Sequence, residues 1–166
     1  MTKREKIVKM ARDEVKNNSL YMWGGQSESV MKTKPEEVLK KETSAGNAAR
    51  VLRLLSNKLT NGVDMSKAKY FDCSGLVVWI LQQLKIIDSD YTAQGIYKNL
   101  CVPILKADLK EGDLVFISTG GKITHVGIYA GENIVIESAG RDMGVVARGM
   151  GKNNWNIFGR VKINEK

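Results

Sequence analysis

The sequence predicts an α+β domain, with helices first and a largely antiparallel sheet of five to six strands after them. Apolar residues recur at helical spacing up to about residue 84, and after Gly112 they alternate in short segments separated by glycine-rich turns. The 166 residues are enough to bury one hydrophobic core, so we expect a single domain over residues 1–166.

The first helix is expected to begin after Thr2, because Thr2 and Glu5 have the spacing of a capping box and an apolar face follows. Residues 26–70 are expected to contain two helices. Pro35 stands where a proline opens a helix, and residues 48–59 carry a second apolar stripe. This region is basic, with nine lysines and arginines against five acidic residues.

The most informative segment is Asp72-Cys73-Ser74-Gly75, which directly precedes the apolar run Leu76–Leu81. The run predicts a buried helix, with Asp72 as its cap and Cys73 at its N-terminus. Unsatisfied backbone N–H groups and the helix dipole favour a thiolate at that position, and the thiolate is the nucleophilic form of cysteine. Cys73 is therefore a candidate nucleophile, provided that a base lies nearby.

Strands are expected after Gly112, joined by hairpin turns at Gly120-Gly121 and Gly131-Glu132-Asn133. The expected strands span Asp113–Ser118, Ile123–Ala130, Ile134–Ser138, Gly144–Arg148 and Ile157–Ile163. Residues 86–111 are expected to form a loop region.

The expected base is His125, the only histidine in the chain, and strand alternation puts it on the same face as Gly127. With a three-residue hairpin loop, Glu137 lies directly opposite His125, whereas a two-residue loop puts Ser138 there. In the first register the Glu137 carboxylate can accept a hydrogen bond from one imidazole nitrogen, and the other nitrogen faces Cys73. Each of these residues alone is more often structural, but together they favour nucleophilic catalysis.

The formal net charge of +8 indicates solubility or attraction to a polyanion such as nucleic acid, anionic lipid or an acidic bacterial wall. The basic residues are spread along the chain without an aromatic stacking platform, so nucleic-acid binding is not indicated. No apolar run reaches the roughly 18–20 residues that a membrane span requires. The N-terminus lacks the pattern of a signal peptide, so we expect either a piece of a longer secreted protein or another route of export.

Cys73 and Cys101 are the only cysteines, and we expect no disulfide between them because it would remove the nucleophile. Two cysteines do not make a disulfide framework, and no Cys-x-x-Cys pair points to zinc. No metal and no cofactor are expected.

These residues resemble the NlpC-type bacterial cell-wall peptidases, a papain-like group of cysteine hydrolases. Four segments and the strand through Glu137 carry the resemblance, in the order that the family has them. The segments are Tyr21-Met22-Trp23-Gly24-Gly25, Phe71-Asp72-Cys73-Ser74-Gly75-Leu76-Val77, Gly112-Asp113-Leu114-Val115-Phe116 and His125-Val126-Gly127-Ile128-Tyr129. The resemblance covers about residues 5–163 apart from 26–70, and the Asp-Cys-Ser-Gly and His-Val-Gly-Ile-Tyr pair makes it specific.

The resemblance implies a papain-like fold in which Cys73 is the nucleophile and His125 the base. Glu137 stands where the family has its third polar residue, which is most often a histidine, so a glutamate there is a departure. The Cys73 backbone N–H and the Tyr21 hydroxyl are implied to hold the oxyanion.

Asp72 and Ser74 match positions that line the cleft in the family, and we interpret Trp23 as a core residue. In the family only a few residues usually separate the Trp-Gly-Gly turn from Asp-Cys-Ser-Gly. Residues 26–70 are therefore a helical insertion, which we interpret as a lid or cleft wall, the alternative being a helical hairpin packed on the back of the domain.

The implied activity is hydrolysis of an amide bond in peptidoglycan stem peptides, between γ-linked D-glutamate and the next diamino acid. We expect a monomer that is secreted or acts on the wall, with anionic wall polymers as a further partner. The alternatives are an N-acetylmuramoyl-L-alanine amidase, another cysteine acyl-transfer enzyme, and a wall-binding module with a degenerate site. A phage lysin, a wall-remodelling enzyme and a toxin are all compatible with these residues.

Overall fold

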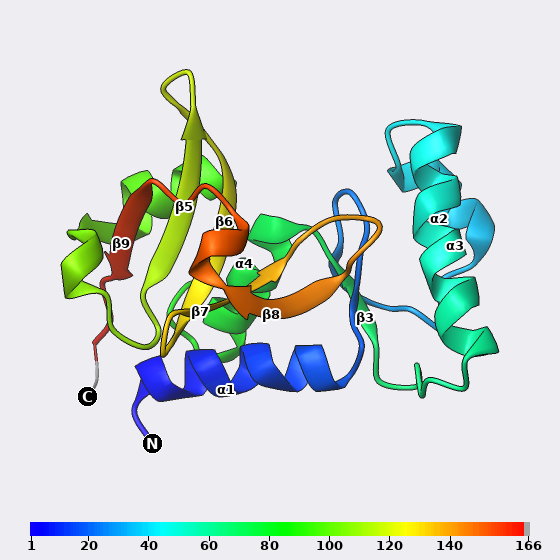
Figure 1. The fold of residues 1–166 in the computed structure, drawn as a ribbon, viewed down its shortest axis with the longest axis horizontal. Helices are drawn as coiled ribbons and strands as arrows, with labels where there is room; N and C mark the ends of the chain where they lie inside the picture. Colours follow the sequence, from blue (N-terminus) through cyan, green and yellow to red (C-terminus); the bar gives the residue numbers. More distant parts are fainter. Residues whose placement is uncertain (165–166) are drawn as a thin grey trace.

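The structure, a computed structural model, describes residues 1–164 and is built around a six-stranded sheet (Figure 1). The strands are antiparallel to their neighbours throughout, so the predicted α+β class with a largely antiparallel sheet is confirmed. In spatial order they are β4 (Cys101–Pro103), β9 (Ile157–Val161), β5 (Leu114–Thr119), β6 (Lys122–Gly131), β7 (Ile134–Ser138) and β8 (Val145–Gly149).

The predicted strands lie where the alternation places them, but the expected loop region at 86–111 contains structure. It holds β4 and three short helices, and a further short helix follows β8. These are α5 (Ala93–Gly95), the π-helical turn η1 (Ile96–Leu100), and the 3₁₀ turns η2 (Lys106–Asp108) and η3 (Met150–Lys152). A three-residue edge strand that ends in proline leaves no alternating pattern to read, and this explains the difference.

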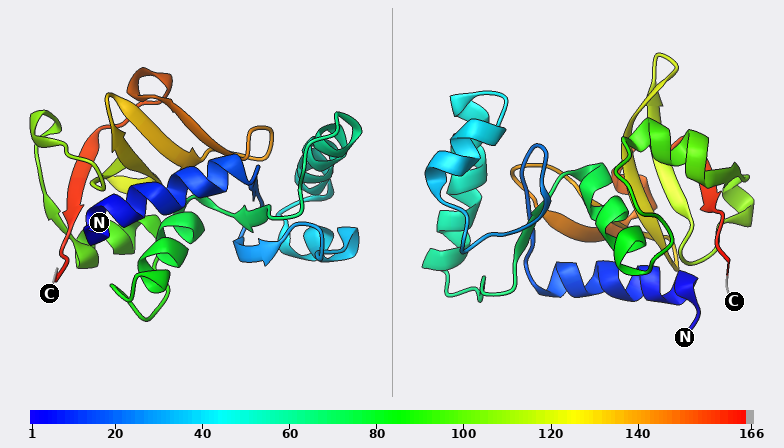
Figure 2. Two further views of the ribbon diagram at one scale, coloured as in Figure 1. Left: turned by 90° about the horizontal axis from the view of Figure 1, so that it is seen from below. Right: turned by 180° about the vertical axis from the view of Figure 1, so that it is seen from behind.

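Two helices cover one face of the sheet, α1 (Lys3–Lys16) and α4 (Cys73–Gln83), and both contact β6 and β7 (Figure 2). The capping box expected at the start of α1 is present, since the Thr2 hydroxyl accepts from the Glu5 N–H and the Glu5 carboxylate accepts from the Thr2 N–H. Helix α4 is buried over most of its surface, with Leu76, Ile80 and Leu81 at most 1% exposed. This packing fixes the N-terminus of α4, and therefore Cys73, against the sheet.

A second, three-stranded sheet lies beside the start of α4, with β3 (Lys69–Phe71) between β1 (Leu20–Tyr21) and β2 (Gln26–Ser29). Strand β1 runs parallel to β3 and pairs Tyr21 with Phe71, whereas β2 is antiparallel to β3. Because Phe71 is followed at once by Asp72 and Cys73, this pairing holds Tyr21 close to the start of α4. Strands of two to four residues are too short to be predicted from periodicity.

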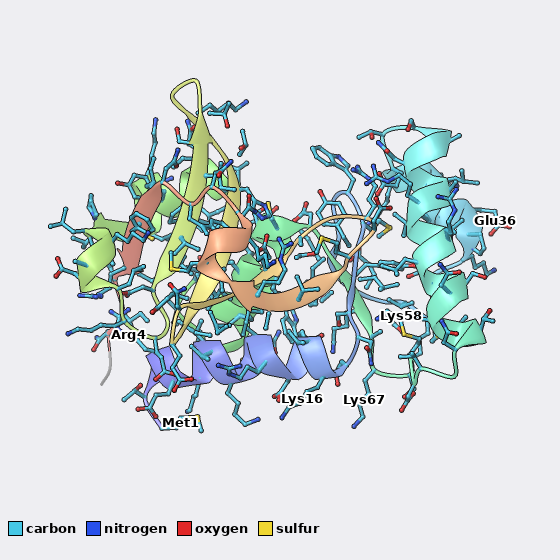
Figure 3. All side chains as sticks on the ribbon, viewed as in Figure 1. Met1, Arg4, Lys16, Glu36, Lys58 and Lys67 are labelled. Atoms are coloured by element: carbon cyan, nitrogen blue, oxygen red, sulfur yellow. The ribbon has the colours of Figure 1, made fainter. Side chains whose placement is uncertain are left out.

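The 26–70 region contains the two expected helices, α2 (Pro35–Lys41) and α3 (Ala45–Thr60). They pack around a hydrophobic cluster that includes Val38, Ala48 and Val51, separate from the cluster beneath the main sheet. Figures 1 and 2 show α2 and α3 standing to one side of the main sheet, joined to it through β2 and β3, and Figure 3 places Glu36 on their outer side. Within residues 1–164 no helix has the length and apolar character needed to cross a membrane.

Candidate active site

Cys73 is the first residue of α4, and Asp72 caps that helix as expected. The Asp72 carboxylate accepts the Gly75 N–H at 2.6 Å and the Gly24 N–H at 3.2 Å, which ties the turn after β1 to the start of α4. A side chain at Gly75 has no room, because a Cβ there would lie 2.1 Å from the Gly25 carbonyl oxygen. Burial raises the pKa of the Asp72 carboxyl, and the hydrogen bonds that it accepts oppose this. Cys73 is thus presented at a helix N-terminus whose neighbouring backbone is closely packed.

His125 on β6 and Glu137 on β7 are in contact, since imidazole Nε2 lies 2.9 Å from the Glu137 Oε1 atom. The expected register, however, is wrong. The ladder pairs Ile128 with Ile136, so its continuation puts Glu137 opposite Gly127. Neither predicted register, with Glu137 or with Ser138 opposite His125, is therefore formed. The turn falls at Glu132 and Asn133, beyond the Gly131–Ile134 pair, and a β-bulge between Tyr129 and Gly131 shifts the ladder by one residue. The shift of two residues keeps Glu137 on the same face as His125, and a diagonal contact results.

The pair is buried and its protonation is coupled to Cys73. The side chain of His125 is 17% exposed and that of Glu137 is 1% exposed. Burial by itself disfavours the imidazolium, but hydrogen bonds to Cys73 and Glu137 and the charges on both outweigh it and raise the pKa of His125 to about 9. Burial also tends to raise the pKa of Glu137, yet the hydrogen bond and charge of His125, with Arg148, hold it below its usual value. The raised pKa keeps His125 as the imidazolium near neutral pH, in contact with the Glu137 carboxylate.

Glu137 has two further partners that the sequence did not indicate. Arg148 on β8 donates from Nη2 to the second carboxylate oxygen at 3.3 Å, and the Asn153 amide donates to Oε1 at 3.3 Å. On the other side, the Trp155 ring stacks on the imidazole, with centroids 5.3 Å apart and planes at 18°. Only Gly127 indicated in the sequence that a further group packs beside His125. A Cβ at that position would lie 2.9 Å from the Trp155 ring.

A cleft of about 450 Å³ opens in front of Cys73 and His125. Tyr21, Trp23, Asp72 and Ser74 line it, so the structure brings all the residues predicted for the nucleophile, base and cleft to one place. Burial, followed by the nearby charges of Cys73 and Asp72, raises the pKa of Tyr21 to about 12, so its hydroxyl keeps its proton. The interpretation of Trp23 as a core residue is wrong: it is 52% exposed at the cleft, because its flanking residue Met22 takes the buried position.

The insertion also reaches the cleft. Arg50 of α3 lines it together with Arg141, which lies in the loop between β7 and β8. Two ion pairs join the insertion to that loop, Glu42 with Arg141 at 2.8 Å and Arg50 with Asp142 at 2.7 Å. The Arg141 guanidinium also lies over the Tyr21 ring, 5.3 Å from its centroid. Residues of both the 26–70 region and the β7–β8 loop therefore line the cleft.

Within residues 1–164, no three His, Cys, Asp or Glu side chains are grouped so that they could hold a metal ion. Both cysteines are free thiols, with Cys101 buried away from the cleft. Burial, with the charge of Asp113, raises the pKa of Cys101 to about 12.

The sequence profile of the NlpC/P60 family matches residues 18–158, which include both the Cys73 segment and the His125 segment. The chain belongs to the NlpC/P60 family. It is 44% identical over 71 residues to murein DD-endopeptidase MepH of Escherichia coli strain K12, a match that covers 41% of this chain and 26% of that protein. It is 36% identical over 95 residues to the probable endopeptidase p60 of Listeria grayi, covering 55% of this chain and 18% of that protein. The chain thus spans less than a third of either relative.

Solved structures of NlpC/P60 proteins have the same fold. RipD of Mycobacterium tuberculosis, described as a non-catalytic NlpC/p60 domain protein adapted to peptidoglycan binding, has a TM-score of 0.62 at 15% identity, covering 99% of both chains. The peptidoglycan hydrolase RipB of the same organism has a TM-score of 0.59 at 20% identity, covering 96% of this chain and 67% of that one. These similarities confirm the expected papain-like fold.

Proposed function

We propose that this NlpC/P60 chain is a cysteine peptidase that hydrolyses an amide bond in peptidoglycan stem peptides, the bond between γ-linked D-glutamate and the next diamino acid. The observation that carries the proposal is that Cys73 and His125 line one cleft, where the imidazole interacts with Cys73 and lies 2.9 Å from the Glu137 carboxylate. Relatives named as endopeptidases support a peptide substrate, and the name of the E. coli relative refers to murein. The protein is accordingly expected to act at the cell wall.

The reaction is an acyl transfer in two steps. The Cys73 thiolate forms a C–S bond to the scissile carbonyl carbon, and the carbonyl electron pair moves to oxygen. When that pair returns, the C–N bond breaks and the His125 imidazolium gives its proton to the leaving amine. Neutral His125 then takes a proton from water, which attacks the thioester and releases the carboxylic acid and the Cys73 thiolate with the imidazolium restored.

The oxyanion would be held by two donors at the start of α4. The Cys73 N–H is at the first turn of the helix, where backbone donors have no partner within the helix. The Tyr21 hydroxyl lines the same cleft and stays protonated because its pKa is raised to about 12. Both donors are fixed before the substrate arrives, and such preorganised donors stabilise a developing charge well.

Digestion of purified peptidoglycan tests the proposed bond, with Cys73→Ala as the matched inactive control. Mass spectrometry should find stems shortened to L-Ala-D-Glu and new amino termini on the diamino acid. If cross-linked dimers disappear while each stem stays intact, the enzyme instead cuts the cross-link between D-configured centres. Free lactyl groups on the sugar would indicate an N-acetylmuramoyl-L-alanine amidase. Wall binding by both forms without any new terminus would support a binding module. Walls with lysine and with diaminopimelate, digested in parallel, identify the preferred diamino acid.

Thiol labelling tests the nucleophile before any substrate is chosen. We expect iodoacetamide near neutral pH to modify Cys73 faster than free cysteine, because the imidazolium stabilises a thiolate. Cys101 is an internal control, since it is buried and its pKa is raised to about 12. A Cys73 rate no higher than that of free cysteine, or equal labelling of both thiols, would contradict the mechanism.

We also infer that the 26–70 insertion acts as a wall of the cleft and narrows the choice of substrate within one catalytic domain. Arg50 on the cleft and the two ion pairs to the β7–β8 loop support this. Deleting residues 30–66 should widen the range of stem peptides that are hydrolysed. Since the deletion also removes the Arg141 partner Glu42, the milder variant Arg50→Gln accompanies it. Unchanged selectivity in both variants would show that the insertion is not a wall.

A further inference from the structure

Two guanidinium groups line the cleft near Cys73, and they differ in how firmly they are held. Arg141 donates from Nε at 2.9 Å and Nη2 at 2.8 Å to one oxygen of Glu42, whose side chain has no exposed surface. Moving Arg141 to a substrate would leave the Glu42 carboxylate buried without its cation, which is strongly unfavourable. Arg141 is therefore committed to the structure of the cleft wall.

Arg50 is the opposite case. Its Nε lies 3.0 Å from Asp142 Oδ1 and its Nη2 lies 2.7 Å from Oδ2, so the guanidinium binds one carboxylate with two parallel hydrogen bonds. The two side chains are 41% and 63% exposed, however, and water solvates both ions when they separate. An exposed pair of this kind contributes little to stability, so another carboxylate can replace Asp142 at small cost.

The proposed substrate brings such a carboxylate into the same cleft. A γ-linked D-glutamate is joined through its side chain, so its α-carboxylate is free and only a few bonds from the scissile carbonyl. With that carbonyl at Cys73, the carboxylate is close enough to the nucleophile to enter the cleft that Arg50 also lines. The corresponding α-carboxamide, isoglutamine, has the same size and no charge.

We propose that Arg50 is a specificity residue that binds the α-carboxylate of the substrate's D-glutamate in place of Asp142. The insertion would then select stem peptides with free D-glutamate over those with isoglutamine. This inference rests on the proposed function, because it takes its ligand from the γ-D-glutamyl bond.

Calorimetric titration of the Cys73→Ala protein with two tripeptides tests this without turnover. The peptides are L-Ala-γ-D-Glu-diamino acid with an α-carboxylate and the same peptide with an α-carboxamide. We expect the carboxylate peptide to bind at least about tenfold more tightly, the range of a charge-assisted hydrogen bond, and Arg50→Gln to abolish the preference. Asp142→Asn should tighten binding of the carboxylate peptide, because the internal competitor is gone.

Arg53→Gln is the matched control, since it removes the same charge one helical turn away. Arg53 is exposed and its charge acts on Asp142, but its side chain does not line the cleft. An equal loss of preference in Arg53→Gln would show a long-range charge effect and overturn the assignment, as would equal affinities for the two peptides or no binding of either. Cleavage by the wild-type protein is scored separately, so failure of the proposed bond is told apart from failure of this inference.

Discussion

His125 Nε2 and Glu137 Oε1 lie 2.9 Å apart although the two residues are diagonal, not opposite, in the β6–β7 ladder. Gly127 occupies the position opposite Glu137, and its missing side chain leaves the space that the glutamate and the Trp155 ring share. The His125–Glu137 contact therefore depends mainly on both residues lying on the same face of the sheet, and less on which residues are directly opposite. A long side chain such as glutamate spans a diagonal on one face of a sheet.

Because His125 is the only histidine, its titration can be followed by NMR without assignment. We expect the imidazole Hε1 shift to titrate near pH 9 in the wild-type protein, well above the ordinary value of about 6.5. Glu137→Gln removes a negative charge and should move the midpoint down, and Cys73→Ala should do so independently. A wild-type midpoint near 6.5 would contradict the coupling of the three groups.

The pH dependence of activity and of stability follows from the same raised pKa. Turnover needs the imidazolium proton, so kcat/KM should fall as the pH rises through about 9, and Glu137→Gln should shift this alkaline limb to lower pH. The pKa of His125 is higher in the folded than in the unfolded chain. The imidazolium therefore stabilises the fold fully below about pH 6.5, and this contribution, at most about 3 kcal/mol, disappears between about pH 6.5 and 9.

Urea denaturation at pH 6 and at pH 9.5 measures this contribution, with His125→Asn as the reference that cannot titrate. The wild-type protein should lose more stability between the two pH values than the variant does. A drop of the same size in both proteins would assign the change to other groups.

Arg148 is expected to be a positioning residue, which acts on the imidazole through Glu137. Arg148→Ala should raise the pKa of Glu137 and also that of His125, because the carboxylate stays ionised while a cation near the imidazolium is lost, so the alkaline limb of kcat moves up while KM changes little. Arg148→Lys should restore most of the wild-type profile because it keeps the charge. Lys152→Ala is the control, because it removes an exposed charge next in sequence to Asn153, which also binds Glu137. An Arg148→Ala profile with lower kcat but unchanged pH dependence would indicate a merely structural role.

The parts of the fold that could be predicted are those set by residues close together in the sequence. The capping box at Thr2, the Asp72 cap and the alternating strands each depend on neighbouring residues, so they are visible in the sequence. Strand β4 and the sheet of β1, β2 and β3 are held by partners far along the chain, and their short lengths leave no periodicity. The register of the β6–β7 hairpin depends on a bulge at the turn, which composition does not specify.

The same distinction applies to the candidate site. The contact between His125 and Glu137 beside the Cys73 cleft could be predicted, because residue type and strand alternation put both side chains on one face. Arg50, Arg148 and other surrounding residues come from separate elements, and no spacing connects them to the motifs. Trp23 was misplaced because it lies in the turn after β1 and not on a strand, so no alternation assigns its side chain to a buried or an exposed face.

Gly127→Ala tests the packing that shapes the imidazole pocket. A Cβ at this position would lie 2.7 Å from Val135 Cγ1 and 2.9 Å from the Trp155 ring, so a neighbour must move. We expect a loss of about 1–3 kcal/mol in the free energy of unfolding and a drop in kcat, as Trp155 leaves the imidazole. Gly149→Ala is the control, because its nearest neighbour would be the Asn133 carbonyl at 4.0 Å. Equal effects of the two substitutions would rule out a specific packing role.

Comparing Glu42→Ala with Asp142→Asn tests which ion pair holds the insertion against the β7–β8 loop. Glu42 is buried and also accepts the Trp23 N–H at 2.8 Å, so its removal leaves both that donor and Arg141 without a partner. We expect Glu42→Ala to cost about 3 kcal/mol or more in unfolding experiments. The Asp142 pair is exposed, so Asp142→Asn should leave the unfolding midpoint nearly unchanged.

This comparison tells whether an ion pair holds the cleft wall in place or is free to bind substrate. The Glu42–Arg141 and Arg50–Asp142 pairs join the same two segments, but the first is buried and the second is exposed. If Glu42 and Arg141 hold the wall, the wall stays in place while Arg50 exchanges Asp142 for a substrate carboxylate. A large destabilisation by Asp142→Asn, similar to that of Glu42→Ala, would mean that the exposed pair also holds the wall. Exchange at Arg50 would then carry a structural cost, and the preference for a free α-carboxylate should be correspondingly weak.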